Sequence, residues 1–241
     1  MQQDHRKDFY EALEKIKTLN SFVISRYADG EASVLKNLTV GNKDGWLYKK
    51  DKNLIFRSDL RKSLTCADKN FVYGISSRNI DEKNYLFLHK FIHQDLIYIT
   101  FSDIWVNANY NMFNELFLAT LYETKKEITI VTNPKANITK LKESINVKDF
   151  IPIKGNCVQY WEKNKDQLKA LLDLKASLNE ETIFLIAAGP LSNILIYEMW
   201  QSNRNNIYLD IGSTLDPIIF NRQSRGYHMP DHPHRNFTNK W

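Results

Sequence analysis

The stretch SFVISRYADGEASVL, residues 21–35, decides how this chain folds. Its first part, "SFVIS", is a short apolar run typical of a buried strand, and a helix is expected to begin within the following "DGEASVLKNL". Between the two lie Arg26, Asp29, Gly30 and Glu31. A cation, a glycine and two carboxylates directly after a buried strand form either a solvated turn or a ligand site.

Short apolar runs alternate with helical segments along the rest of the chain. The pattern predicts strands at residues 70–76, 96–102, 127–133, 148–154, 181–189 and 206–212, and helices at 1–20, 82–93, 109–123, 136–145, 158–178 and 190–202. Residues 41–57 are expected to be an irregular polar excursion. The alternation predicts an α/β fold, a single Rossmann-like domain over residues 1–241 with a mainly parallel sheet and helices on both faces. Residues 213–241 are expected to form a turn-rich C-terminal tail.

Three strand ends carry the chemistry, because ligands of such sheets bind beyond the carboxyl ends of the strands. They are "RYADGE" (26–31), "AAGPLSN" (187–193) and "DIGSTLDP" (210–217).

Asp29 and Glu31 in the first of these ends have two interpretations. In an extended or turn conformation they would project to the same side, with Gly30 easing the turn, and could bind one Mg²⁺ or Mn²⁺ through carboxylate oxygens. On a helix they would point about 200° apart and could not share a ligand. The alternative is therefore an ordinary helix start, with Asp29 as the N-cap and Glu31 in the first turn.

The other two ends are less specific. Gly189 allows a tight turn and Pro190 suits the first helical position, so the helix that follows would present free N–H groups to an anion. An ordinary strand-to-helix turn explains the same residues. Asp210, Gly212 and Ser213 resemble the acidic strand end of a methyltransferase, although that motif normally comes first in the sheet and here ends the last strand.

The tail is cationic. Its candidates are Arg222, Arg225, His228, His232, His234 and Arg235. The histidines lack the helical presentation typical of a zinc site. Either the tail is a polar, mobile end, or its arginines close over a diphosphate, whose oxygens suit the arginine fork.

The composition limits the class of protein. The chain is 43% hydrophobic and 25% charged, which is ordinary for a globular protein, and its net charge of +5 indicates anionic partners. Lysines and arginines form no run of five, so we expect no nucleic-acid partner. Cys66 and Cys157 lack a metal-binding or redox spacing and are expected to be buried thiols. No apolar stretch suits a signal peptide or a membrane span, so we expect a cytoplasmic protein.

Together the three strand ends resemble the GT-D-type glycosyltransferases, a family first described as a domain of unknown function in bacterial surface-glycan clusters. "RYADGE" resembles the signature R-[FY]-x-D-G-E, and "IAAGPLSNILIYEM" resembles the segment GP-x-[AS]-x-x-L. "YLDIGSTLDP" resembles the D-[IV]-G strand that follows, and "SRGYH" a recurrent tail element. The resemblance spans about residues 20 to 230. One departure is Ala28, where the family often has glycine.

The resemblance implies transfer of a sugar from a nucleotide-diphosphate donor, with a UDP-sugar expected, to a hydroxyl of a bacterial surface glycan or of its lipid-linked or protein-linked precursor. It implies Mn²⁺ or Mg²⁺ as cofactor, bound at Asp29 and Glu31. It implies donor contacts from Arg26, Tyr27, Gly30, Gly189, Pro190, Gly212, Ser213 and Arg225. A general base would be needed for an inverting reaction, with Glu31, Asp210, Asp216 and His228 as candidates.

An acceptor of that kind places the enzyme at the inner, anionic membrane face as a peripheral protein. Two other classes stay open. One is a Rossmann-like methyltransferase that uses S-adenosylmethionine, and the other a catalytically silent protein that binds nucleotide-sugars or glycans. The sequence leaves open the sugar, the acceptor, the stereochemistry and the oligomeric state.

Overall fold

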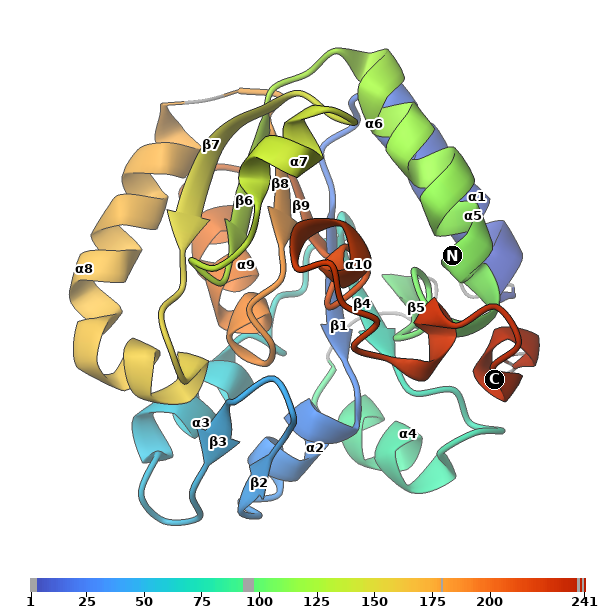
Figure 1. Cartoon of the computed structure of the whole chain (residues 1–241). Helices are drawn as coiled ribbons and strands as arrows, with labels where there is room; N and C mark the ends of the chain where they lie inside the picture. Colours follow the sequence, from blue (N-terminus) through green and yellow to red (C-terminus); the bar gives the residue numbers. More distant parts are fainter. Residues whose placement is uncertain (1–3, 93–97, 179, 238, 240) are drawn as a thin grey trace.

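The protein folds as a parallel sheet between two layers of helices (Figure 1). The coordinates are a computed structural model that describes the whole chain except residues 1–3, 93–97, 179, 238 and 240. Helices α2, α3, α8 and α9 pack on one face, and α1, α6, α7 and α10 on the other. The α/β fold class predicted from the alternation of strands and helices is confirmed.

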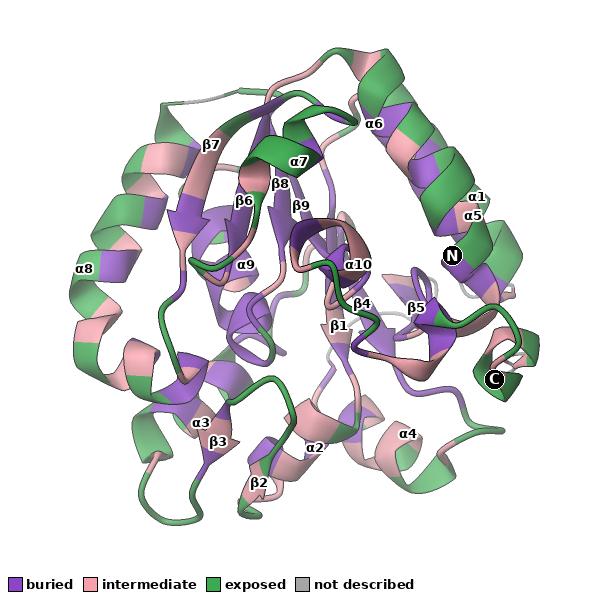
Figure 2. Cartoon of the chain, viewed as in Figure 1, coloured by how far each residue is buried: buried purple, intermediate pink, exposed green. Residues whose placement is uncertain are grey.

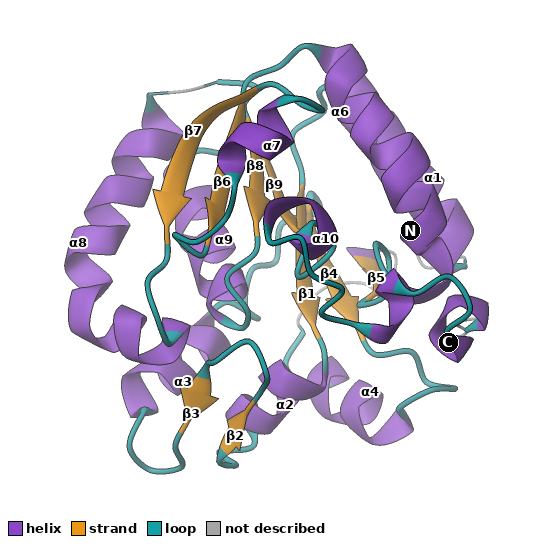
Figure 3. Cartoon of the chain, in the orientation of Figure 1, coloured by secondary structure: helices purple, strands orange, loops and turns teal. Residues whose placement is uncertain are grey.

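Helices and strands alternate along the chain much as the sequence predicts (Figure 3). The strands are β1 (Val23–Tyr27), β2 (Val40–Gly41), β3 (Leu47–Tyr48), β4 (Phe71–Ile75), β5 (Ile99–Phe101), β6 (Ile128–Thr132), β7 (Val147–Pro152), β8 (Ile183–Ile186) and β9 (Ile207–Asp210). The helices are α1 (His5–Lys17), α2 (Asp29–Leu35), α3 (Leu54–Lys62), α4 (Glu82–His89), α5 (Tyr110–Met112), α6 (Leu118–Thr124), α7 (Ile138–Lys142), α8 (Cys157–Ser177), α9 (Leu191–Ser202) and α10 (Asp216–Ile219). A π-helical segment over Phe113–Phe117 joins α5 to α6. Parts of the expected elements at 1–20, 82–93 and 96–102 lie outside the described residues.

The main sheet has seven strands in the order β5-β4-β1-β9-β8-β6-β7, and every pair is parallel. The first strand therefore lies beside the last, with Val23 opposite Tyr208. From β1 the chain builds outward through β4 and β5, and the strands on the other side of β9 are β8, β6 and β7. The direction of winding changes between β1 and β9, and such a switch point opens a crevice at the carboxyl ends of the two strands.

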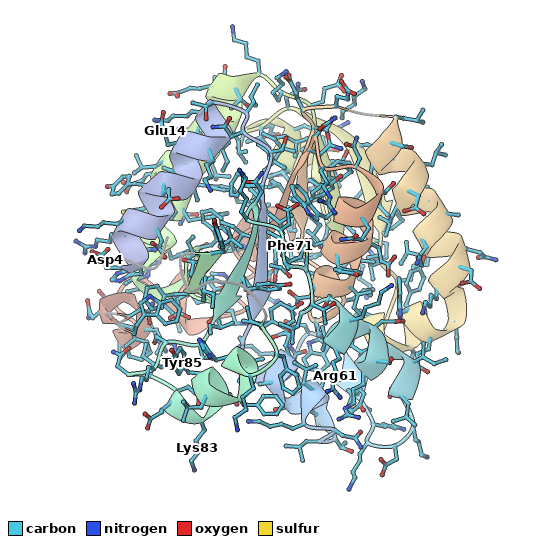
Figure 4. All side chains as sticks on the ribbon, turned by 180° about the vertical axis from the view of Figure 1, so that it is seen from behind. Asp4, Glu14, Arg61, Phe71, Lys83 and Tyr85 are labelled. Atoms are coloured by element: carbon cyan, nitrogen blue, oxygen red, sulfur yellow. The ribbon has the colours of Figure 1, made fainter. Side chains whose placement is uncertain are left out.

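Alternation along the strands gives each helical layer its own core. In β1, Val23 and Tyr27 belong to the cluster with α8 and α9, whereas Ile24, like Phe22 just before the strand, belongs to the cluster with α1 and α6. Six strands of the main sheet, β1, β4, β5, β6, β8 and β9, are buried on both faces, whereas the edge strand β7 is partly exposed (Figure 2). Phe71 of β4 lies deep in this interior (Figure 4). Burial on both faces explains why the strands read as continuous apolar runs rather than as an alternating pattern.

Residues 41–57 are more ordered than the sequence predicts. Strands β2 and β3 form an antiparallel pair closed by a turn in which the Gly45 amide donates to the Asn42 carbonyl (3.1 Å). Gly45 takes a left-handed φ of 85°, as this turn requires. Trp46, Tyr48 and Phe56 are buried, so three aromatic side chains anchor this largely polar segment. Helix α3 then begins inside the segment that was expected to be irregular.

The C-terminal tail is turn-rich as predicted, and buried apolar side chains anchor it to the sheet. Leu215, Ile219 and Tyr227 are buried against the α1–α6 side of the sheet. The Trp241 ring stacks on Phe101 of β5, with ring centroids 4.3 Å apart. Single apolar residues spaced along a polar segment give no periodic signal, yet each one fills a place on the sheet.

Candidate active site

A cavity of about 860 Å³ lies at the carboxyl ends of the central strands. Its walls include Ala28–Glu31 after β1, Ser102 and Asp103 after β5, Thr132 and Asn133 after β6, Ala187–Pro190 after β8, and Asp210, Gly212 and Ser213 after β9. The three strand ends that the sequence singled out therefore meet in one place. Tail residues Arg222 and Arg225 and hairpin residue Asp44 line the cavity where it meets solvent, and buried Tyr227 and Trp46 complete its wall.

Asp29 and Glu31 lie in the first turn of α2, so the helix-start interpretation describes their backbone. The N-cap is Ala28 in an extended conformation rather than Asp29. The Glu31 carboxylate turns back and accepts the Ala28 N–H (2.9 Å), which satisfies one of the unpaired donors of the helix end. The extended D-x-E geometry, with both carboxylates on one side, is not formed. Asp29 is exposed and borders the cavity.

Two carboxyl groups line the cavity: that of Glu31, which is partly buried in the first turn of α2, and that of Asp210, which is buried at the end of β9. Burial raises the pKa of Glu31 to about 7, and the negative charge of Asp210 adds to the effect. Burial likewise raises the pKa of Asp210 to about 6, against the opposing influence of the Arg26 guanidinium. Asp210 accepts the Gly212 N–H (3.0 Å), which closes the turn after β9. Carboxylates that are costly to ionise in the free protein favour a bound cation beside them.

Arg26 reaches from the end of β1 to the turn after β9. Its Nε donates to the Ser102 carbonyl (2.5 Å), which ties the ends of β1 and β5 together. A Cβ placed on Gly212 would lie 2.7 Å from Arg26 Nη1, and Gly212 also has a left-handed φ of 55°. The left-handed turn therefore favours glycine at 212, and a side chain there would also displace the Arg26 guanidinium.

Trp46 was not predicted as a site residue, although it lines the cavity beside two of the predicted glycines. A Cβ placed on Gly189 would lie 3.2 Å from the indole, and the Cβ that Gly30 lacks would lie at the same distance. The two predicted glycines therefore make room for one tryptophan. Gly189 has a left-handed φ of 57°, and Pro190 is the N-cap of α9 rather than its first helical residue. The sequence held one signal that could have identified Trp46: a tryptophan directly after the polar stretch GNKDG (41–45).

An ion pair joins the tail to the β2–β3 hairpin across the mouth of the cavity. Arg225 Nη1 donates to Asp44 Oδ1 (3.0 Å), and Nη2 contacts the second oxygen of the same carboxylate. Arg222 lies 3.9 Å from that carboxylate. Asp44 was not among the predicted residues, because a partner 181 positions away in the sequence has no local signature.

Two predicted site residues lie elsewhere. Tyr27 is fully buried and its hydroxyl bonds with Ser63 of the loop after α3 (2.7 Å), because alternation along β1 sends Arg26 and Tyr27 to opposite faces. The prediction that Tyr27 contacts the donor is wrong for this geometry.

The prediction of His228 as a general base does not fit the structure either. Its Nδ1 accepts the Arg225 N–H (3.2 Å) and its Nε2 lies 3.0 Å from the Ser213 carbonyl, to which it donates in that tautomer. Burial lowers the pKa of His228 to about 4. The ring is a neutral link between the tail and the turn after β9, and it does not line the cavity.

Some of the other predicted residues line the cavity and others do not. Asp216 lines the cavity, burial raises its pKa, and Ser224 Oγ hydrogen-bonds to it. His234 borders the cavity, whereas Arg235 donates to the Tyr227 carbonyl (2.8 Å) and braces the tail. Both cysteines are buried as expected, and Cys157 lines the cavity with its thiol pKa raised to about 12 by burial.

The donor set suits a divalent cation that is held mainly by its substrate. Within the described residues, no three His, Cys, Asp or Glu side chains are grouped to hold a metal ion. Mg²⁺ and similar ions commonly keep several waters and bind one or two carboxylates together with substrate phosphates. Exposed Asp29 at the rim can supply such a carboxylate, whereas the Glu31 oxygen that caps α2 is already occupied.

Comparison with known proteins identifies the fold. No protein-family model and no curated protein matches the chain. Two solved structures match it over 86% of this chain and 77% of their own. One is the selenomethionine-substituted structure of domain of unknown function 1792, with 17% identity and a TM-score of 0.60. The other, with 16% identity and a TM-score of 0.56, is of the same domain and is described as having a distinct glycosyltransferase fold. This chain shares that fold, as its resemblance to the GT-D type implied.

Proposed function

We propose that this protein is a glycosyltransferase that moves a sugar from a nucleotide-diphosphate donor, with a UDP-sugar as the expected donor, to a hydroxyl of a glycan acceptor. The observation that carries the proposal is the convergence of the ends of β1, β8 and β9 on one cavity at the switch point of the sheet. The shared glycosyltransferase fold supports it. The cavity is large enough for a ligand of nucleotide-sugar size.

Charge is arranged in the cavity as a diphosphate and its cation require. Arg26 presents a guanidinium fixed at its Nε by Ser102, which leaves its terminal nitrogens for phosphate oxygens. Arg225 and Arg222 lie across the mouth beside Asp44. The N-terminus of α9 follows Gly189 at the same edge and adds its free N–H groups. These donors would stabilise the charge that develops on the leaving diphosphate.

Asp29 would hold the divalent cation, Mn²⁺ or Mg²⁺, together with the diphosphate oxygens. When bound, such an ion supplies Lewis-acid stabilisation of the leaving group. Glu31 is then the better candidate for the general base, because a pKa of about 7 allows it to accept a proton from an acceptor hydroxyl near neutral pH. Asp210 lies beside it on the neighbouring strand end and would keep the pair oriented through its bond to Gly212.

A thermal-shift panel of nucleotide-sugars, with and without Mn²⁺, tests the proposal, since a ligand of the native state raises the unfolding temperature. We expect stabilisation by a nucleotide-diphosphate sugar that grows with metal, and release of free nucleotide when an acceptor is present. Asp29→Asn should abolish the metal-dependent part. Asp166→Asn, at an exposed position of α8, is the matched control.

Two outcomes would refute the proposal. Stabilisation by S-adenosylmethionine without any effect of metal would indicate a methyltransferase. Donor binding without transfer or hydrolysis, across a broad acceptor panel, would indicate a silent binding protein.

A further inference from the structure

We propose that residues 49–55 and Leu38 form a docking surface for an anionic lipid bilayer, beside the mouth of the cavity. We call these residues the lysine–leucine turn. Its sequence, KKDKNLI, places three lysines within the five residues before two aliphatic side chains. A role in presenting a lipid-linked acceptor rests on the proposed function, whereas binding to the bilayer does not.

Exposed aliphatic side chains gather at this place. Leu54 and Ile55 are 51% and 52% exposed in the first turn of α3, and Leu38 after α2 is 51% exposed. Hydrogen bonds hold the two segments together: Asn37 donates to Asp51 (2.7 Å), and the Lys50 amide donates to Thr39 Oγ1 (3.0 Å). Large aliphatic side chains that reach into solvent together indicate a contact surface rather than scattered exposure.

The charges around these side chains are those that an anionic surface attracts. Lys49, Lys50 and Lys52 are exposed, and none of them forms an ion pair with a described residue. Asp51 is the acidic residue within the turn, and it accepts a hydrogen bond from Asn37. Basic side chains beside exposed leucine and isoleucine are typical of segments that lie in the headgroup region of a membrane.

The turn is ordered, so it presents these side chains without a large ordering cost. The Lys52 and Asn53 amides both donate to the Lys49 carbonyl (3.1 and 3.2 Å), and the Lys49 amide donates to Asn53 Oδ1 (2.8 Å). Buried Tyr48 precedes the turn and donates from its hydroxyl to Asn37 (2.7 Å). A rigid turn loses little conformational freedom when it binds.

The position of the turn relates it to the site. Strands β2 and β3 lie at the lower edge of the molecule in Figure 1, with α2 and α4, where the carboxyl ends of the sheet point. Trp46 and Asp44, which line the cavity, belong to the hairpin that leads into the turn. Lys83 of α4 projects outward at this same edge (Figure 4). A bilayer bound here would lie against the open side of the cavity.

Vesicle co-sedimentation of the full chain tests the proposal. The probes are vesicles of phosphatidylcholine alone and vesicles of equimolar phosphatidylcholine and phosphatidylglycerol. We expect the protein to bind the anionic vesicles and to be released by salt. Replacing Lys49, Lys50 and Lys52 by Gln should weaken binding roughly fivefold per lysine and flatten the salt dependence. Leu54→Ser with Ile55→Ser should weaken binding by at least about tenfold.

A matched control exists on α8, where Leu174 and Leu178 are 53% and 71% exposed. Helix α8 ends before β8 begins, so these leucines lie at the amino edge of the sheet, away from the cavity. Leu174→Ser with Leu178→Ser should leave vesicle binding unchanged. Equal binding to both kinds of vesicle, or full binding by the Leu54 and Ile55 variant, would overturn the proposal.

Two further measurements separate this proposal from its alternatives. The first is the oligomeric state in solution. If the wild type is a dimer that does not bind vesicles, and Leu54→Ser with Ile55→Ser makes it monomeric, then the surface joins two copies and the proposal is wrong. Donor-induced thermal stabilisation should be the same in wild type and turn variants. Vesicle binding without stabilisation by any donor would refute the proposed function and leave the docking surface standing.

Discussion

Replacing Glu31 by Gln should make the free protein more stable at neutral and alkaline pH. Glutamine keeps the size of the side chain, and its amide oxygen can still accept the Ala28 N–H that caps α2. The substitution therefore removes a charge while it preserves the helix start. The charge is costly, because burial raises the pKa of Glu31 from 4.5 to about 7.

The sign of the pH dependence of stability follows from proton binding by Glu31. Between pH 4.5 and about 7 the folded protein holds a proton on Glu31 that the unfolded chain has lost, so the wild type loses stability as the pH rises through this window. At 1.36 kcal/mol per pH unit the full loss is roughly 3 kcal/mol. Water in the open cavity reduces this value, and we expect about 1 to 2 kcal/mol, or roughly 3 to 6 °C in melting temperature for a chain of this size.

Urea unfolding followed by tryptophan fluorescence at about pH 4.5 and about pH 8 measures the effect. Glu31→Gln and wild type should differ little at the lower pH, and the variant should be the more stable at the higher pH. Asp210 titrates in both proteins, so its own contribution largely cancels. Asp29→Asn, at the exposed carboxylate two residues earlier, should show no comparable gain.

Activity should move in the opposite direction. If Glu31 is the base, Glu31→Gln loses turnover while it gains stability, which is the combination expected of a functional residue held at a cost to the fold. A variant that is less stable than wild type at about pH 8, with an unchanged unfolding slope, would show that the carboxylate stabilises the site, and the electrostatic reasoning would then be wrong.

Three further substitutions test other parts of the site. Gly189→Val should weaken donor binding at least about tenfold, or roughly 1.4 kcal/mol, since the new side chain meets Trp46; unchanged affinity by calorimetry in a folded variant would contradict this. Arg225→Ala should lower turnover more than stability, whereas Asp44→Asn, which frees Arg225, should retain turnover. Equal losses of turnover in the two variants would mean that only the ion pair matters. Tyr27→Phe should cost about 1 kcal/mol in urea unfolding through its lost bond to Ser63, with donor affinity unchanged.

The parallel sheet and the meeting of the three strand ends could be predicted because their signals are local. Buried parallel strands are continuous apolar runs, and the residues after each run mark its carboxyl end. Asp210 and Gly189 were therefore identified from their neighbours alone. The sequence did not show that β9 lies next to β1, although this pairing brings Asp210 beside Glu31. Strand order depends on packing between distant segments, which no local pattern records.

The residues that were missed or misplaced share a different physical reason. Trp46 and Asp44 function through partners far along the chain, so their neighbours in sequence carry no trace of the contact. Tyr27 was misplaced because a motif gives the order of residues but not the side of the strand to which each points. His228 was misplaced because its two ring nitrogens are used by backbone groups, which any sequence supplies equally.

The contact of Trp46 with two glycines connects the hairpin to both halves of the site. Gly30 lies in the first turn of α2, and Gly189 lies in the turn that leads into α9. One indole therefore lies against both the segment that carries the proposed cation ligand and the helix end proposed to bind an anion. The same hairpin holds Asp44, which pairs with Arg225 of the tail, and leads directly into the lysine–leucine turn. A movement of this hairpin would shift all of these contacts together. Any coupling between donor binding and bilayer binding would pass through this one small antiparallel pair, and it would be reciprocal, each ligand changing the affinity for the other by the same factor.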